Sequence, residues 1–186
     1  VSPMNRKGRT RTVYQLLGGS PADLLLPANF LVVEGESEVE FLEWVCSRHY
    51  PGMPRIQVVA ADGDDERQAQ YLSSIMKAYA PIGDSPIYKT RTVLLFDAPT
   101  GTVKQQRLDN FLDSNKAIRE DGRAFVLPTE GLEDYYPLDL RKKYEKLKDK
   151  VKLANRIGQE ISKDSFESNM PVMHAALCTC WKQAFQ

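Results

Sequence analysis

Short apolar runs alternate with amphipathic segments between residues 30 and 137, and this alternation predicts an α/β fold with a parallel sheet flanked by helices. After Pro137 the apolar runs stop, and a charged sequence with helical character follows. The composition, with 42% hydrophobic and 27% charged residues, is that of an ordinary globular chain and excludes a disordered or collagen-like one. We therefore expect a lead-in segment over residues 1–29, an α/β core over 30–137, and a small helical subdomain with a closing helix over 138–186.

Four segments have the sequence of buried strands. The first, Phe-Leu-Val-Val-Glu at 30–34, is an apolar run that ends before Gly35, which is typical of a parallel strand covered on both faces. The third strand stops at Asp97 and the fourth at Pro128, which cannot donate to a sheet ladder. The predicted strands are residues 30–34, 55–60, 92–96 and 124–127.

The helices are predicted from apolar residues that recur at helical spacing. The first runs from Ser37, a favoured helix start, to about Arg48. Two more follow the second and third strands, and the last begins at Pro171, because proline suits the first helical turn. The predicted apolar faces of the first three are Val39, Phe41, Leu42 and Val45; Ala69, Leu72, Ile75, Met76 and Tyr79; and Val103, Leu108, Phe111 and Leu112. We also expect residues 138–162 and 171–185 to be helical.

The charges balance in number but not in position. The chain has 25 Lys and Arg residues and 25 Asp and Glu residues, and a net charge of zero argues against a uniformly basic nucleic-acid-binding protein. However, residues 6–11 are basic, 34–66 are mainly acidic, and 141–152 are basic again. A neutral total therefore conceals separate charge clusters, although a single charge run is most often a solvated helix face.

Three features of the sequence bear on its cellular setting. No apolar run reaches the length of about eighteen residues that a membrane helix needs, so we expect no membrane partner. The three cysteines, Cys46, Cys178 and Cys180, lack the spacing of a disulfide framework, which fits a reducing, cytoplasmic compartment. The chain begins at Val1 rather than Met, and we expect it to be part of a longer protein.

Acidic residues follow three of the four predicted strands. Glu34 ends the first strand and Asp97 ends the third, while Glu133 follows the fourth together with Glu130 and Asp134. Because parallel strands end at the same edge of a sheet, these carboxylates should share one rim, where ligands of open α/β sheets bind. Clustered carboxylates repel one another and select hard cations such as Mg²⁺ or Mn²⁺.

The alternative explanation for such acids is that they form turns or cap helices, and we favour it for Asp62, Asp64 and Asp65. It explains Glu34 less well, because Glu is not a preferred turn residue and here ends an apolar run.

The segment 31–38, Leu-Val-Val-Glu-Gly-Glu-Ser-Glu, resembles the opening motif of a Toprim domain, the fold shared by topoisomerases, DnaG-type primases and several nucleases. Glu34 matches the family's first Glu, and Asp97 matches the first residue of its Asp-x-Asp pair. Within that group the chain is most similar to the C-terminal nuclease region of OLD (overcoming lysogenization defect) family proteins. The supporting segments are Glu34 with Glu38, residues 17–23, residues 131–137 (Gly-Leu-Glu-Asp-Tyr-Tyr-Pro), and residues 150–154.

This resemblance implies a divalent-metal-dependent DNA endonuclease that uses two Mg²⁺ or Mn²⁺ ions. The implied metal ligands are Glu34, Glu38, Asp97 and Glu133, with Glu34 also counted as catalytic. Two such ions can activate a water and stabilise the leaving oxygen of a phosphodiester. The resemblance further implies Lys150, or secondly Lys152, as a lysine that neutralises transition-state charge; a phosphate-positioning or merely solvated lysine is the alternative.

The resemblance also implies an N-terminal ATPase domain in the full-length chain, through which copies could assemble into a homo-oligomer. The present sequence contains no Gly-x-x-x-x-Gly-Lys-Ser/Thr motif, so we expect no ATP hydrolysis by this part.

The sequence departs from the Toprim pattern at Pro99, which stands where the second Asp of Asp-x-Asp is expected. Proline offers no side-chain ligand, so either Glu38, Glu133 or Asp62 completes the site, or metal binding is weakened. The second case favours a Toprim-like module that binds DNA or a partner without cleaving it. A third interpretation is a receiver-like domain phosphorylated on Asp97, although the acid after the fourth strand and the basic tail argue against it.

The basic segment after the core is the predicted DNA-binding surface. Lys142, Lys146 and Lys150 recur every four residues, which predicts one stripe along a helix that contacts the DNA backbone, with Lys152 beside it. The basic residues near the N-terminus are either a second contact or part of a linker: Arg6, Lys7, Arg9 and Arg11.

Overall fold

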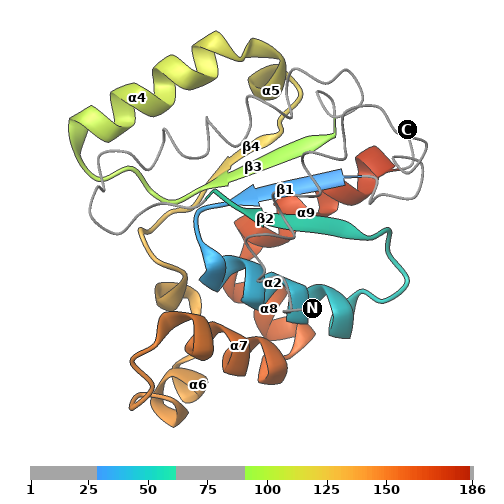
Figure 1. Cartoon of the computed structure of the whole chain (residues 1–186), viewed down its shortest axis with the longest axis vertical. Helices are drawn as coiled ribbons and strands as arrows, with labels where there is room; N and C mark the ends of the chain where they lie inside the picture. The colour runs from blue at the N-terminus through green and yellow to red at the C-terminus, as the bar shows by residue number, and fades with distance from the viewer. Residues whose placement is uncertain (1–28, 62–90, 185–186) are drawn as a thin grey trace, which may run out of the picture.

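A computed structural model describes residues 29–61 and 91–184, and Figure 1 shows these residues in colour. They contain a sheet of four parallel strands in the order β2-β1-β3-β4. The strands are β1 (Asn29–Val33), β2 (Ile56–Ala60), β3 (Thr92–Phe96) and β4 (Ala124–Val126). The predicted parallel α/β sheet is therefore confirmed, and each strand end lies within one residue of its predicted position.

Helices cover both faces of the sheet (Figure 1). One face carries α2 (Glu36–His49), α7 (Lys150–Glu160), α8 (Lys163–Asn169) and α9 (Pro171–Ala184). The other carries α4 (Gly101–Ser114) and α5 (Lys116–Glu120). Alternate residues of a strand point to opposite faces, so Leu31 and Val33 join the first core whereas Val32 joins the second. This two-sided burial explains why β1 and β3 are continuous apolar runs.

The predicted helix faces are confirmed in α2 and only partly in α4. Val39, Phe41, Leu42 and Val45 are all buried, as their spacing predicts. In α4, Leu108 and Phe111 are buried, but Val103 is 62% exposed. Val103 belongs to the first turn of α4, and the helix buries its apolar side chains against the second core only further along.

The prediction of helix over residues 138–162 is wrong in its middle. The chain forms a short 3-10 helix, η3 (Leu132–Tyr135), then α6 (Leu138–Lys143), and does not resume helix until α7. The break at 144–149 is fixed at both ends by side chains. The Tyr144 hydroxyl donates to Glu160 Oε1, 2.5 Å away, and Asp149 caps α7 by accepting from the backbone N–H of Lys152 at 3.0 Å.

The helices after residue 138 share the core of the sheet. α7 crosses α2 closely at Gly158, where an added Cβ would lie 3.0 Å from Trp44 Cβ and 3.1 Å from Phe41 O. α9 packs against β1 and β3 and buries Met173, Leu177 and Trp181. The boundary at residue 137 stays a prediction, and the packing is continuous across it.

Several predictions fall outside the described residues. They are the lead-in segment, the basic residues 6–11, the motif at 17–23, the acids Asp62, Asp64 and Asp65, and the helix over 69–79. Among the described residues, no helix is both long and apolar enough to cross a membrane.

Candidate functional site

Glu34 and Asp97 meet where the two central strands end. The ladder pairs Phe30 with Thr92 and Val32 with Leu94, so Glu34 and Asp97 follow neighbouring strands in nearly the same register. Burial raises the pKa of Asp97, and a hydrogen bond and like charge from Glu34 raise it further, to about 10. At neutral pH Asp97 therefore keeps its proton, and its carboxyl group is hydrogen-bonded to that of Glu34.

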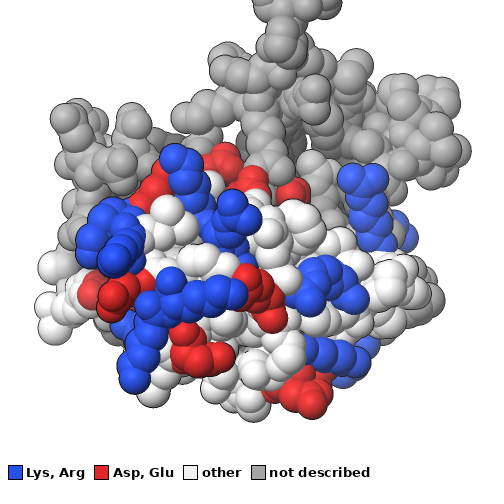
Figure 2. All heavy atoms as spheres, turned by 90° about the horizontal axis from the view of Figure 1, so that it is seen from below, with Lys and Arg blue, Asp and Glu red and all other residues white. Residues whose placement is uncertain are grey.

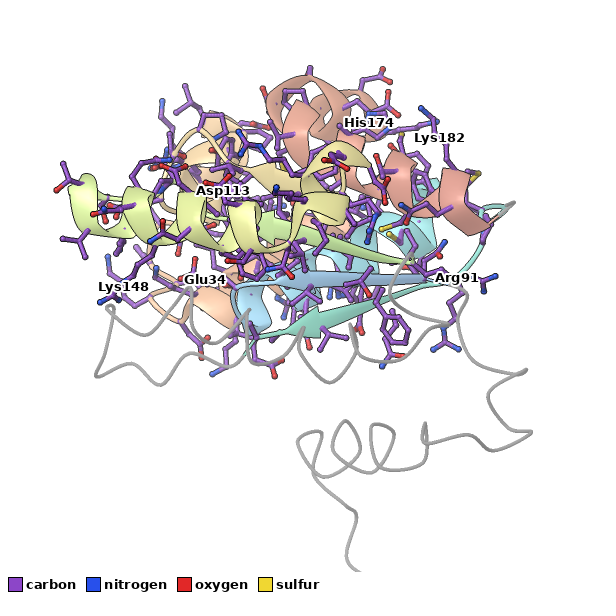
Figure 3. The ribbon with its side chains drawn as sticks, turned by 90° about the horizontal axis from the view of Figure 1, so that it is seen from above. Glu34, Arg91, Asp113, Lys148, His174 and Lys182 are labelled. Atoms are coloured by element: carbon purple, nitrogen blue, oxygen red, sulfur yellow. The ribbon has the colours of Figure 1, made fainter. Side chains whose placement is uncertain are left out.

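One oxygen of this pair has no partner among residues 29–61 and 91–184. Oε2 of Glu34 is buried and receives no hydrogen bond from these residues, and an unpartnered buried carboxylate oxygen is costly. Figure 3 shows Glu34 toward the same end of the molecule as Lys148 and away from Arg91, which precedes β3. The pair thus lies at the carboxyl edge of the sheet, as the strand pattern predicts.

Glu38 adds a third carboxylate and also serves its own helix. It is the third residue of α2, is 6% exposed, and its Oε2 accepts hydrogen bonds from the backbone N–H of Gly35 at 3.2 Å and from Ser37 Oγ at 3.0 Å. Burial raises the pKa of Glu38, those hydrogen bonds lower it, and the charge of Glu34 raises it. Its negative charge in turn helps to raise the pKa of Asp97.

Glu133 brings the fourth carboxylate together with a lysine. It lies in η3, where its charge acts on Asp97, and its Oε1 is 3.1 Å from Nζ of Lys150 at the start of α7. That contact is the main cause that raises the pKa of Lys150, and the charges of Glu38 and Asp97 add to it. The structure therefore places the four predicted ligands and the predicted catalytic lysine close enough for their charges to act on one another.

These residues fit a hard divalent cation by their chemistry. All four acids offer carboxylate oxygens, which Mg²⁺ and Mn²⁺ prefer, and a cation could satisfy Oε2 of Glu34. In residues 29–61 and 91–184, no three His, Cys, Asp or Glu side chains already converge as a metal-holding group. The carboxylates would therefore have to rotate toward one another to bind an ion.

The predicted lysine stripe is wrong as a helix face. Lys142 lies in α6, Lys146 in the turn that follows, and Lys150 at the first position of α7, so no single helix carries them. All three are exposed, as is Lys152, whose Nζ is 3.3 Å from Asp149 Oδ2. Seen from below, where α6 and α7 lie, the surface carries Lys and Arg side chains interleaved with acids (Figure 2).

Two residues near the acids are not among the predicted site residues. Tyr136 is buried, and after burial the charges of Glu133 and Glu38 raise the pKa of its hydroxyl. Lys104 lies in the first turn of α4, 3.9 Å from Glu130 Oε1. The sequence predicts Tyr136 to be a core aromatic residue, and Lys104 lies outside the basic runs. Their sequence context therefore does not mark either residue as part of the site.

Comparison of the chain with protein-family models, with curated proteins and with solved structures found no match.

Proposed function

We propose that this chain is a divalent-metal-dependent DNA endonuclease with a Toprim-like core, and that it forms the C-terminal catalytic region of a larger ATPase–nuclease. The observation that carries the proposal is the Glu34–Asp97 pair, in which two half-buried carboxyl groups that follow neighbouring strands are hydrogen-bonded to each other at the carboxyl edge of the sheet. Such a pair destabilises the fold unless it serves a ligand, and strongly perturbed acids concentrate at functional sites.

Glu34, Glu38, Asp97 and Glu133 would hold the cations. The bound ions would supply an activated water and would neutralise charge on the leaving oxygen of the phosphodiester. Glu34 and Asp97 directly follow β1 and β3, the two central strands of the sheet. Glu38 would have to exchange its hydrogen bonds from Gly35 and Ser37 for the ion, and Glu133 would have to exchange its contact with Lys150.

Lys150 is the proposed transition-state lysine. Its side chain is 73% exposed, so its ammonium can reach a phosphate while its helix stays packed on α2. Glu133 holds that ammonium beside the other acids, 3.1 Å away. Lys142, Lys146 and Lys152 would contact the DNA backbone from the surface of α6, the following turn and α7, and such contacts position DNA without reading its sequence.

The proposal is tested by plasmid nicking in Mg²⁺ or Mn²⁺. We expect Glu34→Gln to lower the nicking rate at least about a hundredfold, because catalytic groups that act on developing charge contribute on that scale. Glu120→Gln is the matched control, because it removes the same charge from an exposed position at the end of α5. Nicking that survives both EDTA and Glu34→Gln would exclude the proposed function.

Two observations favour a second candidate, a Toprim-like module that binds DNA or a partner without cleaving. Glu38 already caps α2, and Pro99 supplies no ligand where the Toprim pattern has an acid. This candidate predicts salt-sensitive DNA binding that needs no divalent cation and is unchanged by Glu34→Gln. The wild type and Glu34→Gln, compared in nicking and in DNA binding, therefore decide between the two candidate functions.

A further inference from the structure

Lys104 places a cation on the α4 side of the carboxyl edge. Its Nζ donates to Thr100 Oγ1 at 2.8 Å and lies 3.9 Å from Glu130 Oε1. Thr100 follows β3 and Glu130 follows β4, and the two loops are joined by a hydrogen bond from the backbone N–H of Ala98 to Thr129 O at 3.3 Å. The side chain is only 24% exposed, which is low for a lysine.

Fold stability gives a poor account of this position. A positive charge in the first turn of a helix opposes the helix dipole, and α4 has no acidic residue in that turn to offset it. Thr100 occupies the N-cap position, but its side chain caps no helix N–H and instead accepts from Lys104. The ion pair with Glu130 is long and largely solvated, so it contributes little.

A cation at this edge can offset the negative charge of the acids toward a bound phosphate. A phosphodiester that approaches Glu34 and Asp97 meets negative charge. Lys150, which contacts Glu133 and is affected by the charge of Asp97, lies on the α7 side. The sheet separates α7 from α4 (Figure 1), so the helix that carries Lys104 and the helix that begins at Lys150 lie on opposite faces of the sheet. Cations on both sides can hold a phosphate backbone that crosses the edge.

We propose that Lys104 is a DNA-backbone contact that holds the phosphate on the α4 side of the site. The inference rests on the proposed function, because it takes DNA as the ligand. It adds a residue that lies outside the basic segment at 141–152 and assigns the β3–α4 connection to substrate binding. Lys104 would exchange its weak contact with Glu130 for a phosphate oxygen and keep its hydrogen bond to Thr100.

The test measures binding of a fluorescent DNA duplex by the 186-residue chain in Ca²⁺, across a series of salt concentrations. We expect Lys104→Gln to weaken binding about three- to tenfold near 100 mM salt and to reduce the slope of log affinity against log salt by about one. Lys104→Arg should restore both. Lys116→Gln is the matched control, because Lys116 is exposed and begins α5, beyond the far end of α4.

The outcomes separate this inference from the proposed function. If Lys104→Gln binds DNA with the wild-type affinity and salt slope while Glu34→Gln loses nicking, the role of Lys104 is wrong and the nuclease proposal stands. If the wild-type chain neither binds nor nicks DNA, both are overturned. Equal losses in Lys104→Gln and Lys104→Arg, with a lowered melting temperature in each, would show a structural role instead.

Discussion

At the amino end of the sheet a buried arginine is hydrogen-bonded to groups of the protein, whereas at the carboxyl end half-buried acids lie beside each other. Arg123, 1% exposed, donates to Asp121 Oδ2 at 3.0 and 3.1 Å and to the carbonyl of Thr92 at 3.0 Å. At the other end, burial and the neighbouring Glu34 raise the pKa of Asp97, and Oε2 of Glu34 has no hydrogen-bond partner among the described residues. Hydrogen bonds within the protein therefore stabilise the amino end of the sheet, whereas a bound cation would stabilise the acids at the carboxyl end.

The largest expected effect on stability is at the amino end. Arg123→Ala should lower the free energy of unfolding by about 3 kcal/mol, because it removes a buried hydrogen-bond network that joins Arg123 to Asp121 and to the Thr92 carbonyl. Arg119→Ala is the control, since its ion pair with Asp113 is exposed and should be worth less than about 0.5 kcal/mol. Urea denaturation of both variants measures the difference. Equal effects would remove the contrast between the two ends.

The next effect concerns the helix that carries Lys150. Gly158→Ala should destabilise the fold by about 1–2 kcal/mol, because the new methyl group meets the backbone of α2 and overpacks the crossing. This net value allows for the gain in helix propensity of about 1 kcal/mol. Gly52→Ala is the matched control, since its added Cβ has nothing within 4 Å. A more stable Gly158→Ala, measured by thermal melting, would contradict the close packing of α7 on α2.

At the carboxyl end a substitution is expected to raise the free energy of unfolding rather than lower it. Asp97→Asn should stabilise the metal-free fold by about 0.5–2 kcal/mol, because it removes a carboxyl group that burial and Glu34 force to take up a proton on folding. Under the proposed function it should also abolish nicking. Urea denaturation in EDTA, with Asp113→Asn as an exposed control on α4, gives the comparison. If Asp97→Asn lowers stability, Asp97 is a structural residue.

The last prediction concerns the slope of stability against pH. Asp97 has a pKa of about 10 in the folded chain and an ordinary value of about 3.9 in the unfolded chain. Between these values the folded state binds more protons, so this group's contribution to stability is full below about pH 4 and is lost as the pH rises toward 10. The stability of the metal-free wild type should therefore fall more steeply over this range than that of Asp97→Asn. Parallel curves would contradict the raised pKa.

The strands and their acidic ends could be predicted from the sequence because both depend on local pattern. β1 and β3 are buried on both faces, and such burial leaves an apolar run that stops where the edge begins. Glu34 and Asp97 are then brought together by strand order alone.

What depends on contacts between distant segments could not be predicted. The break at 144–149 has sequence compatible with helix, and its geometry depends on the contact between Tyr144 and Glu160. Helix α8 was also missed, although Ser162, which caps it by accepting from the N–H of Ser165, is a local signal. The proposed role of Lys104 depends on the contact between the loop after β3 and the loop after β4.

If the carboxylates at the carboxyl edge bind a divalent cation, titration calorimetry of Mn²⁺ into the EDTA-treated chain will show it most directly. We predict saturable binding by the wild type and by Glu120→Gln, and loss of that binding in Glu34→Gln and Asp97→Asn. No binding by the wild type, or the same affinity in Glu34→Gln, would contradict cation binding by these carboxylates.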